Sequence, residues 1–263
     1  MKIIIRNKGG FGNQLFIYAF YLYLRDICPQ HNIVIENFSG FFRNKIVYPH
    51  IQTNKPLLGS FFKIKRGNII DTMLVYIAKF NIKYFKVLDI DFFDGDNSNF
   101  EELKFQKTTV IEGYFQNHQS YEAYLEKTKV VLNKSANKTK NLIKYQNIAL
   151  QIRANDYKFK VNIDYINKAL LNFGVTDNST VHIFTDNIEW CKRNLDFIKM
   201  KKFIKTGNDI KDLFILTAFQ KVILTIGTYG WWGAFLGDNN KKVIYPKNKT
   251  HKKDFYPKKW LRI

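Results

Sequence analysis

The stretch IALQIRANDYKFKVNIDYINKALLNFGVTDNSTVHIFTD, residues 148–186, decides the fold. Its first six residues form an apolar run that predicts a strand, and residues 163–173 carry apolar side chains at helical spacing. A second apolar run, 181–186, predicts another strand. A strand, a helix and a strand in this order predict two parallel strands joined by a crossover helix. The sequence therefore indicates an α/β protein.

The same alternation continues to the end of the chain. Further strands and helices are predicted at 188–195 (helix), 203–206 (strand), 209–219 (helix), 221–227 (strand), 231–237 (helix) and 241–246 (strand). Apolar strands that alternate with short helices predict a parallel sheet covered on both faces. Ligands of such sheets bind beyond the carboxyl ends of the strands. We therefore searched these ends for functional residues.

The first half of the chain carries a less regular α/β pattern. It predicts strands at 2–7, 32–37 and 108–115, helices at 13–27, near 70–80 and 118–132, and a loop at 91–99. The polar, lysine-rich segment NKSANKTKN, 133–141, is typical of a linker. We therefore predict two Rossmann-like domains, 1–140 and 141–263, whose parallel sheets face a central cleft.

Composition limits the functions that the protein can have. The 263 residues are 46% hydrophobic and 24% charged, which predicts a globular chain with a core. The formal net charge of +20 suits anionic partners, although lysines scattered over a solvated surface explain it equally well. No arginine-rich helix or RNA-binding aromatic motif is present, so nucleic acid is not an expected partner.

The two cysteines and the N-terminus bear on location. Cys28 and Cys191 stand alone, which argues against a disulfide framework or a zinc site. We find no signal-peptide pattern and no run of 18 apolar residues. We expect a cytoplasmic protein, with peripheral contact to the inner face of the cytoplasmic membrane as an additional possibility.

A glycine-rich loop, KGGFGNQ at 8–14, follows the first predicted strand. Gly10, Phe11, Gly12 and Asn13 are candidate ligand-binding residues, because N–H groups at a helix start bind anions or sugar oxygens. Leu15 stands where a dinucleotide-binding motif has its third glycine. A plain tight turn is the alternative, but two consecutive amides favour a ligand loop.

Two further candidates follow predicted strands. Arg153, in QIRANDY, can make a bidentate contact to a phosphate. An ion pair between Arg153 and Asp156 is the structural alternative. Asp186, in FTDN, can accept hydrogen bonds from a guanine edge or from ribose hydroxyls. The alternative for Asp186 is an ordinary cap of the helix that begins at 188.

The last candidate is GTYGWWGAF, 227–235, which has the residues of a strand-to-helix phosphate loop with the amides of Thr228 and Tyr229 available. Trp231 and Trp232 are expected to pack the helix rather than to stack on a sugar. No acidic pair ends a strand, so no metal or other cofactor is expected. Asp89 and Asp91 form the string DID, which lies in the poorly patterned region.

Several of these segments occur together, in order, in one known family. With GGFGNQLFIYAF, EGYFQN (112–117), IRANDY, IFTDN and GTYGWWGAFLG, the chain resembles the bacterial α-1,2-fucosyltransferases of glycosyltransferase family 11. The resemblance implies a GT-B-like fold and metal-independent, inverting transfer of L-fucose from GDP-β-L-fucose to a galactoside hydroxyl of a bacterial surface glycan. The acceptor would be an oligosaccharide or a lipid-linked glycan, and Tyr114 and Gln116 would bind it.

The motifs depart from the family pattern in two places. The family reads H-x-R-R-G-D-Y, where this chain has Gln151 for the histidine and Ala154 for the second arginine. By the resemblance, Arg153 would bind the leaving diphosphate, and Gln151 would lie near the nucleotide base. Asp156 is a candidate for the general base of the reaction. The departures leave two alternatives: a different nucleotide-sugar donor, or a non-catalytic glycan- or nucleotide-binding relative.

Overall fold

The computed structural model describes residues 1–41, 55–80, 90–96, 105–136, 145–155, 160–247 and 255–263. The chain divides into two compact units, Met1–Ser135 and Ala136–Ile263. The domain boundary predicted between residues 140 and 141 lies outside the described residues.

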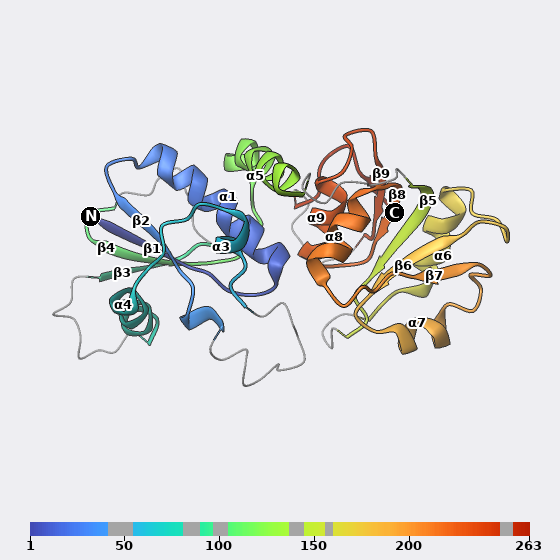
Figure 1. Ribbon diagram of the computed structural model, residues 1–263, viewed down its shortest axis with the longest axis horizontal. Helices are drawn as coiled ribbons and strands as arrows, with labels where there is room; N and C mark the ends of the chain where they lie inside the picture. Colours follow the sequence, from blue (N-terminus) through green and yellow to red (C-terminus); the bar gives the residue numbers. More distant parts are fainter. Residues whose placement is uncertain (42–54, 81–89, 97–104, 137–144, 156–159, 248–254) are drawn as a thin grey trace. The chain divides into compact units, whose positions relative to one another are not determined.

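The first unit contains a four-stranded parallel sheet in the order β2-β1-β4-β3. Its elements are β1 (Lys2–Arg6), α1 (Phe11–Ile27), β2 (Asn32–Glu36), α3 (Leu58–Phe61), α4 (Ile69–Phe80), β3 (Ile90–Asp94), β4 (Thr108–Glu112), a 3-10 turn (Gln119–Tyr121) and α5 (Glu122–Ala136). Figure 1 shows α1 and α4 on opposite sides of this sheet. The strand order reverses between β1 and β4, so the connections leave the sheet in opposite directions there.

Several predicted ranges in this unit differ from the structure: β4 ends at Glu112 rather than at residue 115, and α5 spans Glu122–Ala136 rather than 118–132. Helix α1 begins at Phe11 rather than at residue 13, and Gly12 lies in its first turn. Residues 91–94 belong to β3 and not to a loop, because each position from Ile90 to Asp94 pairs with β4. β3 is an edge strand in which no residue is fully buried, and this explains why its apolar pattern is weak.

The second unit contains a six-stranded parallel sheet in the order β10-β9-β8-β5-β6-β7. Its elements are β5 (Tyr145–Ile152), α6 (Ile163–Asn172), β6 (Val181–Thr185), α7 (Ile188–Asn194), β7 (Lys201–Phe203), α8 (Asp209–Thr217), β8 (Phe219–Leu224), α9 (Thr228–Phe235), β9 (Lys242–Tyr245) and β10 (Leu261–Arg262). Figure 1 shows α6 and α7 on one side of the sheet and α8 and α9 on the other. The reversal of strand order lies between β5 and β8.

The core of the second unit fills the predicted positions. Leu150, Ile183 and Ile223, from three neighbouring strands, are fully buried. Helix α9 starts three residues earlier than predicted, and both of its tryptophans are fully buried. Trp231 donates its indole N–H to the carbonyl of Phe255 at 2.9 Å. The prediction that the tryptophans pack the helix is confirmed.

The length and polarity of the helices bear on whether any of them could span a bilayer. Within the described part of the chain, no helix combines the length and the apolar character needed to cross a membrane.

Candidate functional site

The reversal of strand order in the second unit brings two strand ends together. The chain leaves β5 at Arg153 and β8 at Thr225, and the backbone N–H of Arg153 donates to Thr225 Oγ1 at 3.1 Å. At such a reversal the flanking connections pass to opposite faces of the sheet, which leaves a crevice at the carboxyl edge. This edge is therefore the natural place for a ligand in this unit.

Arg153 lies beside the start of α9. A Cβ atom added to Gly227 would lie 3.5 Å from Cδ and 3.9 Å from Nη1 of Arg153. Gly227 is the N-cap of α9, provides no side-chain cap and has φ 97° and ψ 155°. The first N–H groups of a helix lack partners within the helix and carry partial positive charge. The exposed guanidinium and this helix start together form an arrangement suited to a phosphate or diphosphate.

Asp186 holds the loop that follows Arg153. Its Oδ1 accepts the backbone N–H of Ala154 at 2.7 Å and that of Asn155 at 3.3 Å. The structural alternative for Asp186 was wrong, because Asn187 is the cap of α7 and its Oδ1 accepts from the N–H of Trp190 at 2.9 Å. The carboxylate of Asp186 thus fixes the path of the chain beside Arg153, and its nucleotide-binding role stays a prediction.

Gln151 presents a buried acceptor under α9. The side chain is 6% exposed, and among the described residues its Oε1 has no hydrogen-bond partner. A Cβ atom on Gly230 would lie 2.4 Å from this oxygen. A buried acceptor without a partner costs about 1–3 kcal/mol, which a ligand N–H or O–H can recover. Because this oxygen is buried against Gly230, a ligand could reach it only if α9 moved, and the donor-binding role of Gln151 stays a prediction.

Thr228 and Tyr229 open the first turn of α9. The phenol of Tyr229 donates to the carbonyl of Asp209 at 2.6 Å. Burial, together with the carboxylates of Asp212 and Asp209, raises the pKa of Tyr229 well above its usual range. The hydroxyl therefore anchors α9 to α8, and only the backbone N–H of Tyr229 remains for the predicted contact with a ligand.

In the first unit, an ion pair that the sequence did not predict joins the ends of β1 and β4, where the strand order reverses. Arg6 ends β1 and Glu112 ends β4, and Arg6 Nη1 lies 2.7 Å from Glu112 Oε1. Lys8 and Lys79 each place Nζ 2.9 Å from the same oxygen. Burial alone would raise the pKa of Glu112, but Lys8, Lys79 and Arg6 outweigh it and lower the pKa to about 2. A carboxylate with this pKa is a poor general base.

We expect Glu112 to make stability depend on pH in acid. Its pKa is about 2 in the folded protein against an ordinary value of 4.5, so its contribution is complete above pH 4.5 and is lost as the pH falls toward 2. At about 1.4 kcal/mol for each pKa unit, the difference corresponds to ~3 kcal/mol, and the largely buried side chain limits its screening by solvent. Urea unfolding from about pH 5 to pH 2 measures this loss. Glu112→Gln should flatten that part of the profile.

The matched control is Glu189→Gln, which alters an exposed glutamate of α7 that pairs with Lys192. This variant should keep the acid dependence of the unchanged protein. If Glu112→Gln shows the same dependence as Glu189→Gln, the three cations do not stabilise Glu112 as described.

The predicted residues of the glycine loop and of EGYFQN lie together in the first unit. Gly9 has φ 78°, and a Cβ there would lie 2.8 Å from Asn13 Nδ2 and 3.1 Å from Tyr114 Cε1. Gln116 Nε2 donates to Asn13 Oδ1 at 3.3 Å, and Lys8 Nζ lies 4.4 Å from the centre of the Tyr114 ring. Polar side chains and aromatic rings of this kind are suited to sugar recognition. Asn13, Tyr114 and Gln116 thus form one cluster.

The side chains of the other residues in the glycine loop contact the protein itself and are not available to a ligand. Gly10 is the N-cap of α1, and Phe11 is 2% exposed and packs on Phe61. Gln14 is fully buried, donates to the carbonyl of Gly9 at 3.1 Å and accepts from the N–H of Leu57 at 2.8 Å. Of the two consecutive amide side chains, that of Gln14 therefore fixes the loop, whereas that of Asn13 belongs to the cluster with Tyr114 and Gln116. Gly10, Phe11 and Gly12 can contribute only backbone groups to a ligand.

Two predictions concern residues that the structure does not describe. The candidate base Asp156 lies outside the described residues, as does Asp89 of the DID string, whereas Asp91 lies in β3. Across the described ranges, no three His, Cys, Asp or Glu side chains gather as metal ligands would. The base and the absence of a metal requirement both stay predictions.

Comparison with known proteins adds to this geometry. Residues 2–263 match the family model described as Glycosyl transferase family 11. An α-1,2-colitosyltransferase from Escherichia coli is 24% identical over 180 residues, which cover 57% of this chain and 61% of the relative. Galactoside α-(1,2)-fucosyltransferase 2 from Mus musculus is 35% identical over 92 residues, 33% of this chain and 26% of the relative. Each match spans less than two thirds of the curated relative.

A solved structure carries the same fold. The Escherichia coli heptosyltransferase WaaC with ADP is similar with a TM-score of 0.53 at 10% identity, over 100% of this chain and 92% of that one. With the two parallel sheets, this likeness confirms the predicted α/β, GT-B-like fold class. The cleft between the domains stays a prediction.

Proposed function

Because the chain belongs to glycosyl transferase family 11, we propose that it transfers a sugar from a nucleotide-sugar donor to a carbohydrate hydroxyl. The specific reaction we propose is inverting transfer of L-fucose from GDP-β-L-fucose to a galactoside, which forms an α-1,2 linkage. The acceptor would be the end of an oligosaccharide or of a lipid-linked glycan of the bacterial surface.

One observation carries this proposal. Arg153 lies against Gly227 at the start of α9, at the edge where β5 and β8 end. When the sugar leaves a nucleoside diphosphate, negative charge grows on the diphosphate oxygens. A guanidinium and helix N–H groups held in place before the reaction stabilise that charge. A non-catalytic relative could hold a diphosphate with the same groups, so a transfer assay is the measurement that separates an enzyme from a binding protein.

The first unit carries further candidate recognition residues of its own. Asn13, Tyr114 and Gln116 lie together beside Gly9, and we propose that they recognise the donor sugar and the acceptor. Asp156 remains our candidate for the base that takes the proton of the attacking hydroxyl. The three cations around Glu112 lower its pKa to about 2, which makes it a poorer base than an aspartate with an ordinary pKa would be.

A second donor is supported by one relative. The α-1,2-colitosyltransferase matches 57% of this chain, and Gln151 and Ala154 depart from the pattern of the fucosyltransferases. Colitose is therefore the alternative sugar for the same site and the same reaction type. Assaying the protein with GDP-fucose and with the corresponding colitose donor, against one galactoside acceptor, separates the two.

We expect GDP to stabilise the protein more than UDP. Asp186 lies at the predicted nucleotide edge, and its carboxylate can accept N–H groups of guanine. At a hundredfold excess over its dissociation constant, a ligand of the native state adds about 2.7 kcal/mol of stability. Thermal melting with each nucleotide at equal concentration measures the difference. A larger shift with UDP would move the proposal to another nucleotide sugar.

We expect transfer to continue at full rate in EDTA. The positive groups at the proposed leaving-group site are Arg153 and the start of α9, which would do the work that a divalent cation does elsewhere. Initial rates with EDTA and with added Mg²⁺ or Mn²⁺ test this. Loss of activity in EDTA that Mg²⁺ or Mn²⁺ restores would contradict the proposal.

The +20 chain would also suit contact with the anionic inner face of the cytoplasmic membrane, where a lipid-linked acceptor resides. Binding to anionic vesicles but not to neutral ones is the measurement that tests this contact.

A further inference from the structure

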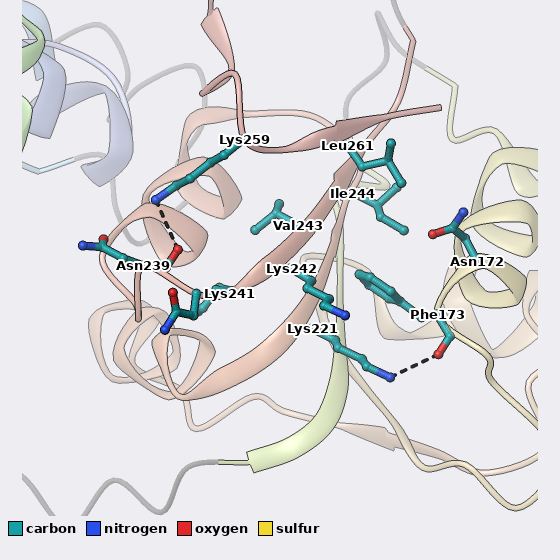
Figure 2. Close-up of a pocket in the computed structure, with 11 residues that line it drawn as sticks. Asn172, Phe173, Lys221, Asn239, Lys241, Lys242, Val243, Ile244, Lys259 and Leu261 are labelled. Carbon is teal, nitrogen blue, oxygen red and sulfur yellow. Dashed lines mark hydrogen bonds between the residues drawn. The ribbon is translucent and has the colours of Figure 1, made fainter.

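A pocket of about 470 Å³ opens in the second unit, lined by the end of α6, strands β8, β9 and β10, and the turn before β9 (Figure 2). Four of its lining side chains are lysines, Lys221, Lys241, Lys242 and Lys259, and three are asparagines. No lining residue is acidic. Its volume falls in the range of pockets that hold small molecules. It is therefore a cationic pocket of small-molecule size.

The pocket is separate from the proposed transfer site. Lys221 lies four residues before Thr225 along the same strand, which is about 13 Å at 3.3 Å per residue. Lys242 is the first residue of β9, and Phe173 directly follows the C-terminal end of α6. Both mark the amino edge of the parallel strands, whereas Arg153 and Gly227 lie at the carboxyl edge. A ligand in this pocket would therefore bind at a different place from the proposed sugar donor.

Lys221 and Lys242 are held next to each other. They are directly paired residues of the parallel strands β8 and β9, so their side chains leave the same face of the sheet, with strands ~4.8 Å apart. Figure 2 shows both side chains extending toward Phe173. Two positive charges at this spacing repel each other, and an anion between them removes that cost.

Protein groups do not neutralise these charges. Lys221 Nζ donates to the carbonyl of Phe173 at 3.1 Å, and Lys259 Nζ donates to the carbonyl of Asn239 at 3.3 Å. A carbonyl brings at most the partial negative charge of a helix end, as at Phe173 after α6, and not a full counter-charge. Among the residues that the structure describes, none of Lys221, Lys242 and Lys259 forms an ion pair. The pocket keeps a positive potential for a ligand from outside the chain.

From this arrangement we infer that the pocket is a second anion site, which binds a phosphate-bearing ligand between Lys221 and Lys242. A phosphate group carries up to two negative charges on one centre, so it matches two ammonium groups on adjacent strands. Each ammonium has three N–H donors, and the one used for Phe173 leaves Lys221 two more. The ligand is either a free phosphorylated compound or the headgroup of a phospholipid.

The first test is protection of individual lysines from acetylation. An amine-reactive ester labels exposed lysines, and peptide mass spectrometry gives the rate at each one. With inorganic pyrophosphate up to ~10 mM, ten times a weak dissociation constant of ~1 mM, labelling of Lys221 and Lys242 should slow by ~10-fold. Lys199 and Lys202 are exposed residues at and beside β7, at the opposite edge of the sheet, and should keep their rates.

The second test uses matched double variants in an Arg153→Ala background, which removes the cation of the proposed transfer site. Pyrophosphate binding by calorimetry should be lost in Lys221→Gln/Lys242→Gln and kept in Lys199→Gln/Lys202→Gln, which carries the same change of charge. Circular dichroism checks that both variants are folded. Equal binding by both variants would overturn the inference.

Vesicles distinguish the two sources of phosphate. Phosphatidylcholine vesicles with and without phosphatidic acid replace pyrophosphate in the acetylation experiment. Protection of Lys221 and Lys242 by the phosphatidic acid vesicles assigns the site to a lipid headgroup. Protection by pyrophosphate alone assigns it to a free phosphorylated compound. If neither protects these two lysines, the pocket is not an anion site.

Discussion

Arg153→Ala is expected to lower the rate of sugar transfer by about 10²–10³-fold, the usual effect of removing one charge-stabilising donor from an active site. The guanidinium lies against the start of α9 at the carboxyl edge of the sheet, where the proposed leaving diphosphate would bind. Position 154 is an alanine, so no neighbouring arginine is there to take over. Arg153→Lys should recover little, because an ammonium cannot make the bidentate contact. Initial rates of transfer to a galactoside measure the effect.

The matched control is Arg193→Ala, which alters an exposed arginine of α7 that donates to the carbonyl of Glu189 in the same helix. It should keep full activity. Melting temperatures of all three variants should stay close to that of the unchanged protein, because exposed side chains contribute little to stability. Near-normal turnover of Arg153→Ala would show that another cation holds the diphosphate. A loss of melting temperature in this variant would assign the residue a structural role.

Gly227→Ala is expected to lower activity by ~10²-fold through misplacement of Arg153 and of the start of α9. With φ 97° and ψ 155°, Gly227 adopts a conformation that is essentially restricted to glycine, and another residue costs ~1–3 kcal/mol there. The new Cβ would lie at an ordinary van der Waals distance of 3.5 Å from Arg153 Cδ, so the expected effect comes from backbone strain and not from a clash. If the backbone relaxes to relieve the strain, the guanidinium and the helix N–H groups move together. Steady-state kinetics and thermal melting of the same preparation measure both effects.

The variant Gly174→Ala is the control that separates the effect of backbone strain from the effect of a displaced Arg153. Gly174 also has positive φ, 69°, but a Cβ there meets nothing within 4 Å. This variant should lose some stability and keep its rate of transfer. If Gly227→Ala and Gly174→Ala lose equal activity, the loss comes from general destabilisation, and the backbone conformation at Gly227 does not position Arg153.

The α/β fold class could be predicted because its signal is local. Runs such as IALQI and VHIF are mostly apolar, as is typical of strands covered on both faces, and the helices between them show their own period. The same reasoning placed Arg153 and Asp186 at the carboxyl ends of strands. It failed at β3, an edge strand without a fully buried residue, whose conformation depends on its pairing with β4.

The partners of polar side chains were not predictable in this way. Asp186 accepts from the backbone N–H of Ala154, 32 residues away, and Arg6 pairs with Glu112, 106 residues away. Both pairs depend on which strands are neighbours in the sheet. Periodicity reports how each strand is buried but carries no information about strand order.

The sequence by itself thus determined that parallel strands alternate with helices, and that Arg153, Asp186 and the glycines stand at their carboxyl ends. Tertiary structure alone decided that strand order reverses between β5 and β8 and between β1 and β4. It thereby decided that Arg153 meets Gly227, that Gln14 fixes the loop beside Asn13, and that Lys221 lies next to Lys242. The physical reason is that burial is fixed locally by the type of side chain, whereas strand order results from competition among pairings of residues far apart in the chain.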